Sequence, residues 1–395
     1  MGDQGSQTAV LARYFDTSAT TPAAAEVLEA MALAQATAWA NPSSLHLPGL
    51  AAAELLERSR LSLAEGLGCE LDELVVTSGG TEAIHLALLG AAAALEPGRL
   101  LISAVEHPAT LAAAAQLQQR GWSVQTVPVD SQGLLDLDVL DGLLIPPTRL
   151  VSVIWGQNEV GSLQPIEAIG ARCRRAGVPL HVDAVQVLGH LPVVFRQLPI
   201  DLLSGAAHKL QGPRGVGLLL VRRGLALQAQ LGGGGQEGGR RGGTEPVVLL
   251  SGFARALELS CATPSSLAPL RDSLLHRLLS LPGVRLSGPP PGDLRLPHHI
   301  SLLVASEAGL PLSGRELVRQ LSRQGFALSS GSACSSSGSA ASPVLRALGI
   351  SEADAASGLR ISLGPWHRAA DLEALALALQ VTLAASVASE HPLTA

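Results

Sequence analysis

This sequence lacks the features that identify membrane proteins, nucleic-acid-binding proteins and secreted proteins. No run reaches the roughly 18 uninterrupted apolar residues of a membrane-spanning helix, so we expect no membrane segment. The chain has no basic block and a formal net charge of −6, which argues against nucleic acid as its primary ligand. Its N-terminus has no basic region followed by an apolar one, so we expect no secretory signal.

Cysteine is scarce, with four residues scattered along the chain. Their spacing contains none of the pairs that bind zinc or build a disulfide framework, so the sequence predicts no metal site. Unpaired thiols are typical of a reducing compartment, where a thiol can act as a reagent. We therefore predict a cytoplasmic protein.

Lysine is scarcer still. Of 27 basic side chains, 26 are arginine and one is Lys209. Arginine can supply a cation at most positions, but its guanidinium group is not a neutral amine nucleophile at ordinary pH. A lysine that must form a Schiff base is therefore one that arginine cannot replace. The alternative is that one lysine remained by chance, and composition alone does not decide between the two.

Short apolar runs alternate with helix-like stretches from about residue 73 to 221. Such alternation is typical of a mostly parallel sheet covered by helices. We expect helices at Thr81–Leu95, Ala109–Arg120 and Pro165–Ala176. The expected strands are Leu74–Thr77, Leu100–Ala104, Ser123–Val127, Leu150–Trp155, Leu180–Asp183, Asp201–Ser204 and Gly215–Val221.

Polar residues follow several of these strands, where ligands bind in sheets of this type. Gly79 and Gly80 come after the first strand and open a helix, so their N–H groups can hold an anion, although half of such turns are only turns. Asp183 ends another strand and is either structural or the partner of a pyridinium nitrogen. His107 follows a third strand. A lone histidine in such a place is more often a buried core residue than a functional one.

The composition changes after residue 222. Residues 231–246, LGGGGQEGGRRGGTEP, hold eight glycines in sixteen positions. They are either a flexible connection or a loop whose backbone approaches a ligand, such as a phosphate, closely. We predict a large domain at residues 16–261 and a small domain formed by residues 262–395 together with residues 1–15.

Seven motifs occur in order: SGGTEA, EHPAT, NEVGSLQP, HVDAVQ, AAHKLQGPRGVG, RRGGTEP and SSGSACSSS. The set extends from about Tyr14 in YFDTSATTP to Leu363 in GLRISLG, nearly the whole chain. It resembles the class V aminotransferase family of fold-type I pyridoxal-phosphate enzymes, and specifically its cysteine desulfurase branch. The resemblance implies an α/β fold, with a mostly parallel seven-stranded sheet in the large domain and a smaller α+β domain.

The resemblance also implies roles for individual residues. Lys209 would hold pyridoxal 5'-phosphate as an internal aldimine and later move the substrate Cα proton. Asp183 would pair with the ring nitrogen and His107 would stack on the ring. Arg360 would bind the substrate carboxylate through its two-pronged guanidinium group. Cys334 would attack the substrate sulfur.

Further residues are implied to bind the cofactor. Asn158 and Gln186 would lie near the ring hydroxyl, with Asn158 also close to the substrate. Gly80, Thr81 and His208 would hold the phosphate. Thr244 would reach the phosphate of a second subunit, so the resemblance implies a homodimer with shared sites.

The sequence departs from the family pattern at three positions. Ala206 stands where the family usually has a serine, so one phosphate hydrogen bond is missing unless Ser204 or a water replaces it. His85 stands in place of an asparagine, and Gln236 in place of a frequent histidine. These departures put cofactor affinity and loop details in question rather than the reaction class.

The segment around Cys334, GSACSSSGSAASP, is rich in small residues and is expected to be mobile. Nine residues separate Cys334 from VLRALG, which resembles the long-loop branch that supplies sulfur for iron–sulfur clusters and tRNA. The alternative is a low-complexity surface loop whose cysteine is incidental.

The predicted reaction converts L-cysteine to L-alanine and leaves a persulfide on Cys334 for a sulfur-acceptor protein. A selenocysteine or cystine lyase is the nearest alternative and would not need Cys334. A non-catalytic sulfur-relay scaffold is the other, and the presence of Lys209, Asp183, His107 and Arg360 together argues against it.

Overall fold

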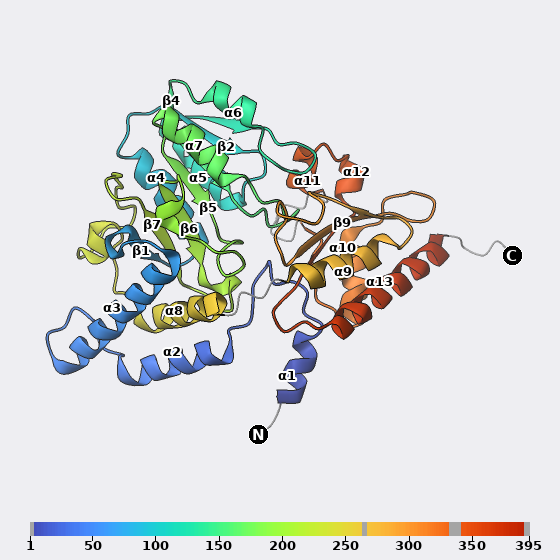
Figure 1. Ribbon diagram of the computed structural model, residues 1–395, viewed down its shortest axis with the longest axis horizontal. Helices are drawn as coiled ribbons and strands as arrows, with labels where there is room; N and C mark the ends of the chain where they lie inside the picture. The colour runs from blue at the N-terminus through green and yellow to red at the C-terminus, as the bar shows by residue number, and fades with distance from the viewer. Residues whose placement is uncertain (1–3, 263–266, 332–340, 391–395) are drawn as a thin grey trace.

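Two sheets, of seven and of three strands, form the centre of the molecule (Figure 1). The structure is a computed structural model that describes residues 4–262, 267–331 and 341–390. The large sheet is built from residues 74–221 and the small one from residues 284–362. The chain therefore has an α/β part followed by a smaller part with its own sheet.

The large sheet has the strand order β1-β7-β6-β5-β4-β2-β3, and every neighbouring pair is parallel except the two that involve β7. Its central strands are buried along their whole length, as expected of a sheet covered on both faces. The strands are β1 (Leu74–Thr77), β2 (Arg99–Ser103), β3 (Ser123–Val127), β4 (Thr148–Ile154), β5 (Leu180–Asp183), β6 (Leu202–Ala206) and β7 (Gly217–Val221).

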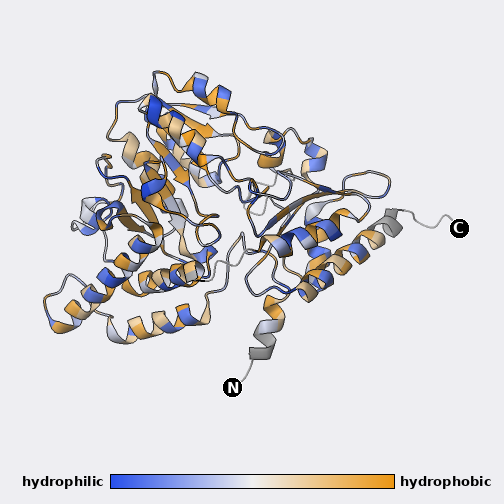
Figure 2. Cartoon of the chain, in the orientation of Figure 1, coloured by the Kyte–Doolittle hydropathy of each residue, from blue (hydrophilic) through white to orange (hydrophobic). Residues whose placement is uncertain are grey.

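Helices pack on both faces of this sheet because its apolar residues point alternately to either side. Leu100 and Ile102 of β2 join one buried cluster with α4 and α5, and Leu101 joins another with α3, α7 and α8. Figure 2 shows the apolar residues concentrated on these strands, while the helices carry both kinds. The helices are α1 (Gln4–Leu11), α2 (Ala25–Thr37), α3 (Leu47–Leu67), α4 (Gly80–Ala92), α5 (Pro108–Gln119), α6 (Leu137–Leu143), α7 (Ile166–Ala176) and α8 (Val247–Ala262).

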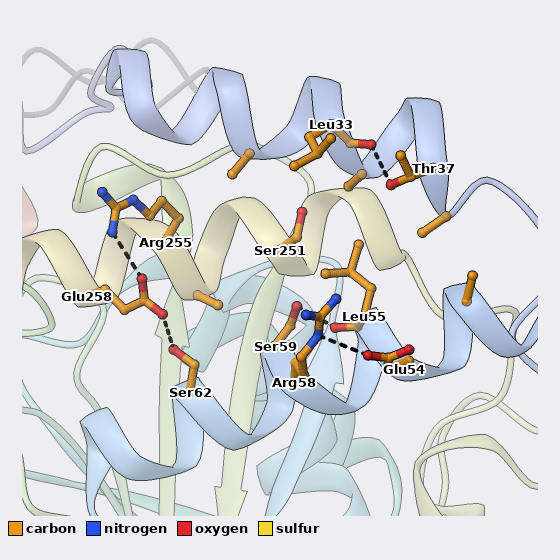
Figure 3. Close-up of a pocket in the computed structure, with 15 residues that line it drawn as sticks. Leu33, Thr37, Glu54, Leu55, Arg58, Ser59, Ser62, Ser251, Arg255 and Glu258 are labelled. Carbon is orange, nitrogen blue, oxygen red and sulfur yellow. Dashed lines mark hydrogen bonds and ion pairs between the residues drawn. The ribbon is translucent and has the colours of Figure 1, made fainter.

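Helices α2, α3 and α8 pack against one another outside the sheet (Figure 3). They surround a hollow of about 480 Å³ that is lined by both apolar and polar side chains, including Leu33, Leu55, Arg58 and Glu258. Four short 3-10 turns complete this part: η1 (Leu71–Glu73), η2 (Phe195–Gln197), η3 (Ala207–Lys209) and η4 (Gln236–Gly239).

The C-terminal part has a third apolar core around an antiparallel sheet. Phe15, from the other end of the chain, is fully buried in this core. Its backbone N–H donates to Ala327 at 2.7 Å and its carbonyl accepts from Ser362 at 2.8 Å. The elements are α9 (Ala268–Leu279), β8 (Val284–Leu286), β9 (His299–Val304), α10 (Gly314–Arg323), α11 (Pro343–Ala347), α12 (Glu352–Ala355), β10 (Gly358–Ser362) and α13 (Ala369–Glu390).

The predicted fold class is confirmed, since the large sheet has seven strands and is mostly parallel. The expected strands Leu74–Thr77, Ser123–Val127 and Leu180–Asp183 match the structure at both ends, and the ends of the other expected elements differ by three residues at most. The last strand, for example, begins at Gly217 because Gly215 has a φ of 90°, outside the extended region. Among the described residues no helix is long and apolar enough to cross a membrane. The domain boundaries remain a prediction.

Candidate active site

Three of the predicted site residues, Asp183, Lys209 and His107, lie at the carboxyl ends of the central strands. Asp183 is the last residue of β5, and in register it lies beside Ile154 of β4 and Ser204 of β6. Lys209 ends the short turn η3 that directly follows β6. This edge of the sheet is where ligands bind in α/β proteins.

Lys209 points toward the N-terminal segment. Its Nζ donates hydrogen bonds to the backbone carbonyls of Ser18 and Ala19, the latter at 2.7 Å. Burial raises the pKa of Asp183 and lowers that of His107, and the nearby positive charge of Lys209 acts to lower both. A cavity of about 670 Å³ reaches Lys209, with residues 21–26 and 363–366 among its lining.

Asp183 is a buried carboxyl group, 3% exposed. Its Oδ1 accepts a hydrogen bond from the backbone N–H of Val185 at 3.0 Å. Burial raises its pKa to about 6, against the lowering effects of this hydrogen bond and of the Lys209 charge. A buried carboxylate of this kind gains stability when a cation is placed beside it, so Asp183 suits a protonated ring nitrogen.

His107 caps the N-terminus of α5, where its Nδ1 accepts from the Ala109 N–H at 3.1 Å. The ring proton of the neutral form is therefore on Nε2. Burial, with the Lys209 charge, lowers the His107 pKa to about 4. At neutral pH the imidazole is uncharged, which suits a ring that stacks on an aromatic cofactor.

Gly79 and Gly80 form the turn into α4, whose first N–H groups face away from the helix body. A Cβ on Gly80 would lie 2.8 Å from Val185 Cγ2, so the glycine lets this turn approach the strand end that carries Asp183. The backbone N–H of Ser78 donates to Glu82 at 2.6 Å. Thr81 is exposed in the first turn of α4. A helix N-terminus of this form is a ready anion site.

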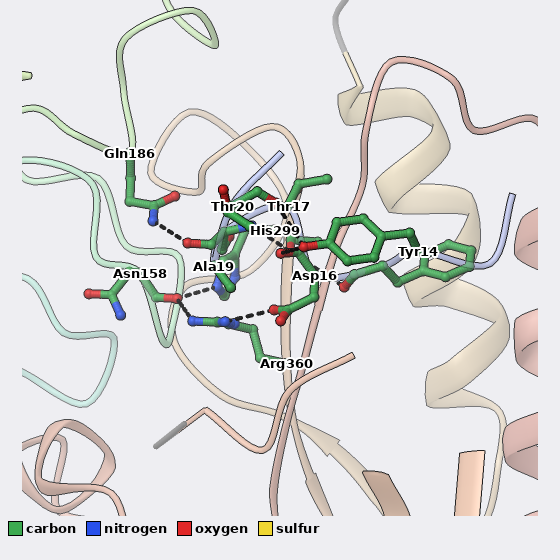
Figure 4. Close-up of polar contacts among 12 residues, drawn as sticks. Tyr14, Asp16, Thr17, Ala19, Thr20, Asn158, Gln186, His299 and Arg360 are labelled. Atoms are coloured by element: carbon green, nitrogen blue, oxygen red, sulfur yellow. Dashed lines mark hydrogen bonds and ion pairs between the residues drawn. The ribbon is translucent and has the colours of Figure 1, made fainter. Parts of the chain in front are cut away.

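Arg360 and Asn158 lie beside the N-terminal segment (Figure 4). Arg360 Nη1 donates to the backbone carbonyl of Asn158 at 3.0 Å, and Nη2 donates to Asp16 Oδ1 at 2.8 Å. The Asn158 side chain points away from Arg360. Gln186 Nε2 donates to the Ser18 carbonyl at 2.8 Å, while its Oε1 is buried with no partner in the part of the chain that the structure describes.

These features fit the cofactor that the resemblance implies. The site offers a carboxyl group buried beside one amine, a neutral imidazole, a helix N-terminus and an unsatisfied amide oxygen at Gln186. Together they match a cationic ring, an aldehyde, a phosphate and a ring hydroxyl. His208, which was predicted to hold the phosphate, has its Nδ1 3.1 Å from the Thr20 hydroxyl.

The glycine-rich stretch, residues 231–246, is a loop fixed by hydrogen bonds and not a flexible linker. Gln236 Oε1 accepts from the N–H groups of Gly234 and Gly243 at 3.0 and 3.1 Å. The buried Glu237 accepts from Arg60. The substitution at Gln236 therefore closes the loop on itself. At His85, another of the three departures from the family pattern, Nδ1 lies 2.9 Å from the Thr81 carbonyl oxygen.

Two predicted residues stand apart. Thr244 is exposed on the glycine-rich loop, and Cys334 lies outside the described residues. Sequence reasoning missed Asp16, Ser18 and Ala19, which contact Arg360 and Lys209. The motif YFDTSATTP was the signal that these residues deserved a role.

Restoring a hydroxyl at Ala206 is expected to tighten cofactor binding. The Ala206 methyl group is fully buried and lies 3.8 Å from the position that a Cβ on Gly80 would take, so it faces the turn. Ala206→Ser should strengthen retention by about 0.5–1.5 kcal/mol, the net worth of one hydrogen bond. The cofactor-free variant should melt lower than wild type, because the added hydroxyl is then buried without its partner. Retention during dialysis measures the first effect, and unchanged retention would mean that another donor already fills the gap.

Comparison with known proteins agrees with this geometry. The family model "Aminotransferase class-V" matches residues 13–375. The chain is 39% identical to a cysteine desulfurase of Cereibacter sphaeroides, over 92% of this chain and 93% of that protein. It is 37% identical to the cysteine desulfurase IscS of Methanosarcina thermophila, over 91% and 89%. A solved structure titled "NIFS-LIKE PROTEIN" superposes with a TM-score of 0.87 at 32% identity, covering 94% of this chain and 99% of that one. The chain therefore belongs to the class-V aminotransferase family and, within it, to the cysteine desulfurases, which depend on pyridoxal phosphate.

Proposed function

We propose that this cysteine desulfurase divides its reaction between the Lys209 amine and the Cys334 thiol. The observation that carries the proposal is the convergence of Lys209, Asp183 and His107 at one edge of the sheet, with Arg360 reached through residues 16–19. The proposed overall reaction turns L-cysteine and the enzyme thiol into L-alanine and an enzyme persulfide.

The described residues supply binding and proton transfer. When bound, pyridoxal phosphate supplies an electron sink that makes the bonds at Cα and Cβ of the amino acid easier to break. Asp183 would stabilise a positive charge on the ring nitrogen, and the uncharged His107 imidazole would lie against the ring. Arg360 binds the substrate carboxylate. The Lys209 amine would hold the cofactor and would move the proton at Cα of the substrate.

The sulfur step needs a second nucleophile. The thiolate of Cys334 attacks Sγ of the substrate, a sulfur–sulfur bond forms, and the bond between Sγ and Cβ breaks. The electron pair of the broken bond remains with Cβ, which takes a proton and becomes the methyl group of L-alanine. The persulfide is then passed to the thiol of an acceptor protein. We propose an iron–sulfur or tRNA sulfur pathway, supported by the length of the segment after Cys334, and a cytoplasmic location.

We also propose a homodimer with shared sites. Thr244 is exposed on a loop that Glu237 and Arg60 hold in place. Large apolar side chains are exposed on and between α2 and α3, and one of them, Leu33, also lines the hollow between the helices: Leu28, Leu33, Trp39, Leu45, Leu47 and Leu50. A second copy packed against these helices would remove the six apolar side chains from water, which favours association.

Mixed dimers test whether Thr244 serves the partner's site. A Lys209→Ala protomer paired with a Thr244→Ala protomer should have one site with both lesions and one with neither. Heterodimers purified through two different tags should therefore recover about half of the wild-type activity, although each variant homodimer is impaired. If Thr244 serves its own subunit, each site of the heterodimer carries one lesion and no recovery is expected.

A further inference from the structure

The guanidinium group of Arg360 already holds a carboxylate. Its Nη2 donates to Asp16 Oδ1 at 2.8 Å and its Nη1 donates to the Asn158 carbonyl at 3.0 Å. The Arg360 side chain is 4% exposed, so little water screens this ion pair. Its Nε is buried and has no hydrogen-bond partner among the residues that the structure describes.

The backbone of Asp16 is fixed independently of its carboxylate, which Arg360 holds. The Asp16 backbone bridges to Ser362, and its carbonyl accepts from the Tyr14 hydroxyl at 3.2 Å. The Asp16 side chain is 20% exposed, five times as much as that of Arg360. Rotation of this short side chain can therefore carry the carboxylate away from Arg360 and into contact with water, with no movement of the backbone.

We propose that Asp16 is a resident counter-ion of Arg360, which the carboxylate of the amino-acid substrate displaces and which returns when the product leaves. The inference rests on the proposed role of Arg360 as the carboxylate site. Two carboxylates on one guanidinium group repel each other strongly where water is largely excluded. A substrate carboxylate bound by two parallel N–H groups also competes with Asp16 for Nη2.

With this exchange, the affinity for a carboxylate ligand reflects a difference in free energy between two ion pairs. One joins the ligand to Arg360, and the other joins Asp16 to Arg360. Without substrate, Asp16 spares the protein a buried, unpaired arginine. With substrate or product bound, the lost Asp16 contact weakens binding of both. L-alanine carries the same carboxylate as L-cysteine, so the returning Asp16 side chain assists release of the product.

Removing the charge of Asp16 tests the exchange. The holoenzyme variant Asp16→Asn keeps the shape and an acceptor oxygen but not the competing charge. We expect it to bind L-alanine roughly 10-fold more tightly than wild type does, the size expected for one charge-assisted hydrogen bond. Titration calorimetry measures the Kd, and steady-state assays should show a lower KM for L-cysteine together with a lower kcat, because alanine leaves more slowly.

Matched ligands and variants isolate the effect. L-alaninamide lacks the carboxylate and should bind wild type and Asp16→Asn equally. Asp141→Asn removes an aspartate that pairs with Arg172 at 3.1 Å on the surface, and should leave L-alanine affinity unchanged. Asp16→Ser, which also lacks the charge, replaces Asp16→Asn if the latter melts well below wild type.

Two results distinguish a failure of the counter-ion proposal from a failure of the assignment of Arg360 as the carboxylate site. Unchanged or weaker L-alanine binding in a stable Asp16 variant would overturn the counter-ion role and leave Asp16 as a residue that only positions Arg360. If Arg360→Lys keeps the wild-type preference for L-alanine over L-alaninamide, Arg360 is not the carboxylate site, and that part of the proposed function fails instead.

Discussion

Lys209→Ala is expected to lose the visible absorption band of the holoenzyme and to lower alanine formation by at least about 10²–10⁴-fold, the usual contribution of a positioned proton-transfer group. The chain has no other lysine, so no second amine can take over the covalent link to the cofactor. Its Nζ donates hydrogen bonds to the Ser18 and Ala19 backbone carbonyls, and alanine removes these together with the amine. Absorption spectra and an alanine assay measure the two losses.

Lys209→Arg is the matched control, because it keeps a positive charge near Asp183 but supplies no nucleophilic amine. It should therefore fail like the alanine variant. Borohydride reduction of the wild-type holoenzyme should label one peptide, the one that contains Lys209. A label on another side chain, or full activity of the arginine variant, would contradict the assignment.

Local sequence pattern predicted where several site residues lie, and the family resemblance supplied their roles. Asp183 ends a short apolar run of strand-like pattern, and Gly79 and Gly80 precede a helix-like stretch, so the strand end and the glycine turn could be located. Lys209 was marked by the absence of every other lysine. Short-range pattern and composition carried this information, and the structure brings these residues to one edge of the sheet.

Partners far apart along the chain could not be found in that way. Arg360 and Asp16 are 344 positions apart, and Lys209 and Ser18 are 191 apart, so no periodicity relates them. The glycine-rich loop shows the same limit, because glycine content indicates backbone freedom while one buried side chain, Glu237, decides where the loop lies. These contacts depend on tertiary packing and not on local propensity.

Cys334→Ser is expected to stop sulfur transfer while leaving the fold and the cofactor in place. The other cysteines make the assignment selective. Burial raises the pKa values of Cys69 and Cys173 to about 12, so both remain thiols at neutral pH and are poor nucleophiles. Cys261 is exposed and is the remaining competitor among the described residues. Serine is a far weaker nucleophile toward sulfur than a thiolate, so alanine formation should fall to the level of a no-enzyme control.

Mass spectrometry after addition of L-cysteine locates the sulfur. The wild-type peptide that contains Cys334 should gain about 32 Da, the mass of one sulfur atom in a persulfide. Cys261→Ser is the matched control and should keep both the mass gain and the wild-type rate of alanine formation. The Cys334→Ser variant should still shift the cofactor spectrum when L-cysteine binds, because Lys209 and Arg360 are unchanged. If this variant makes alanine at the wild-type rate, Cys334 is not the nucleophile, and a lyase that releases sulfur without an enzyme thiol becomes the better assignment.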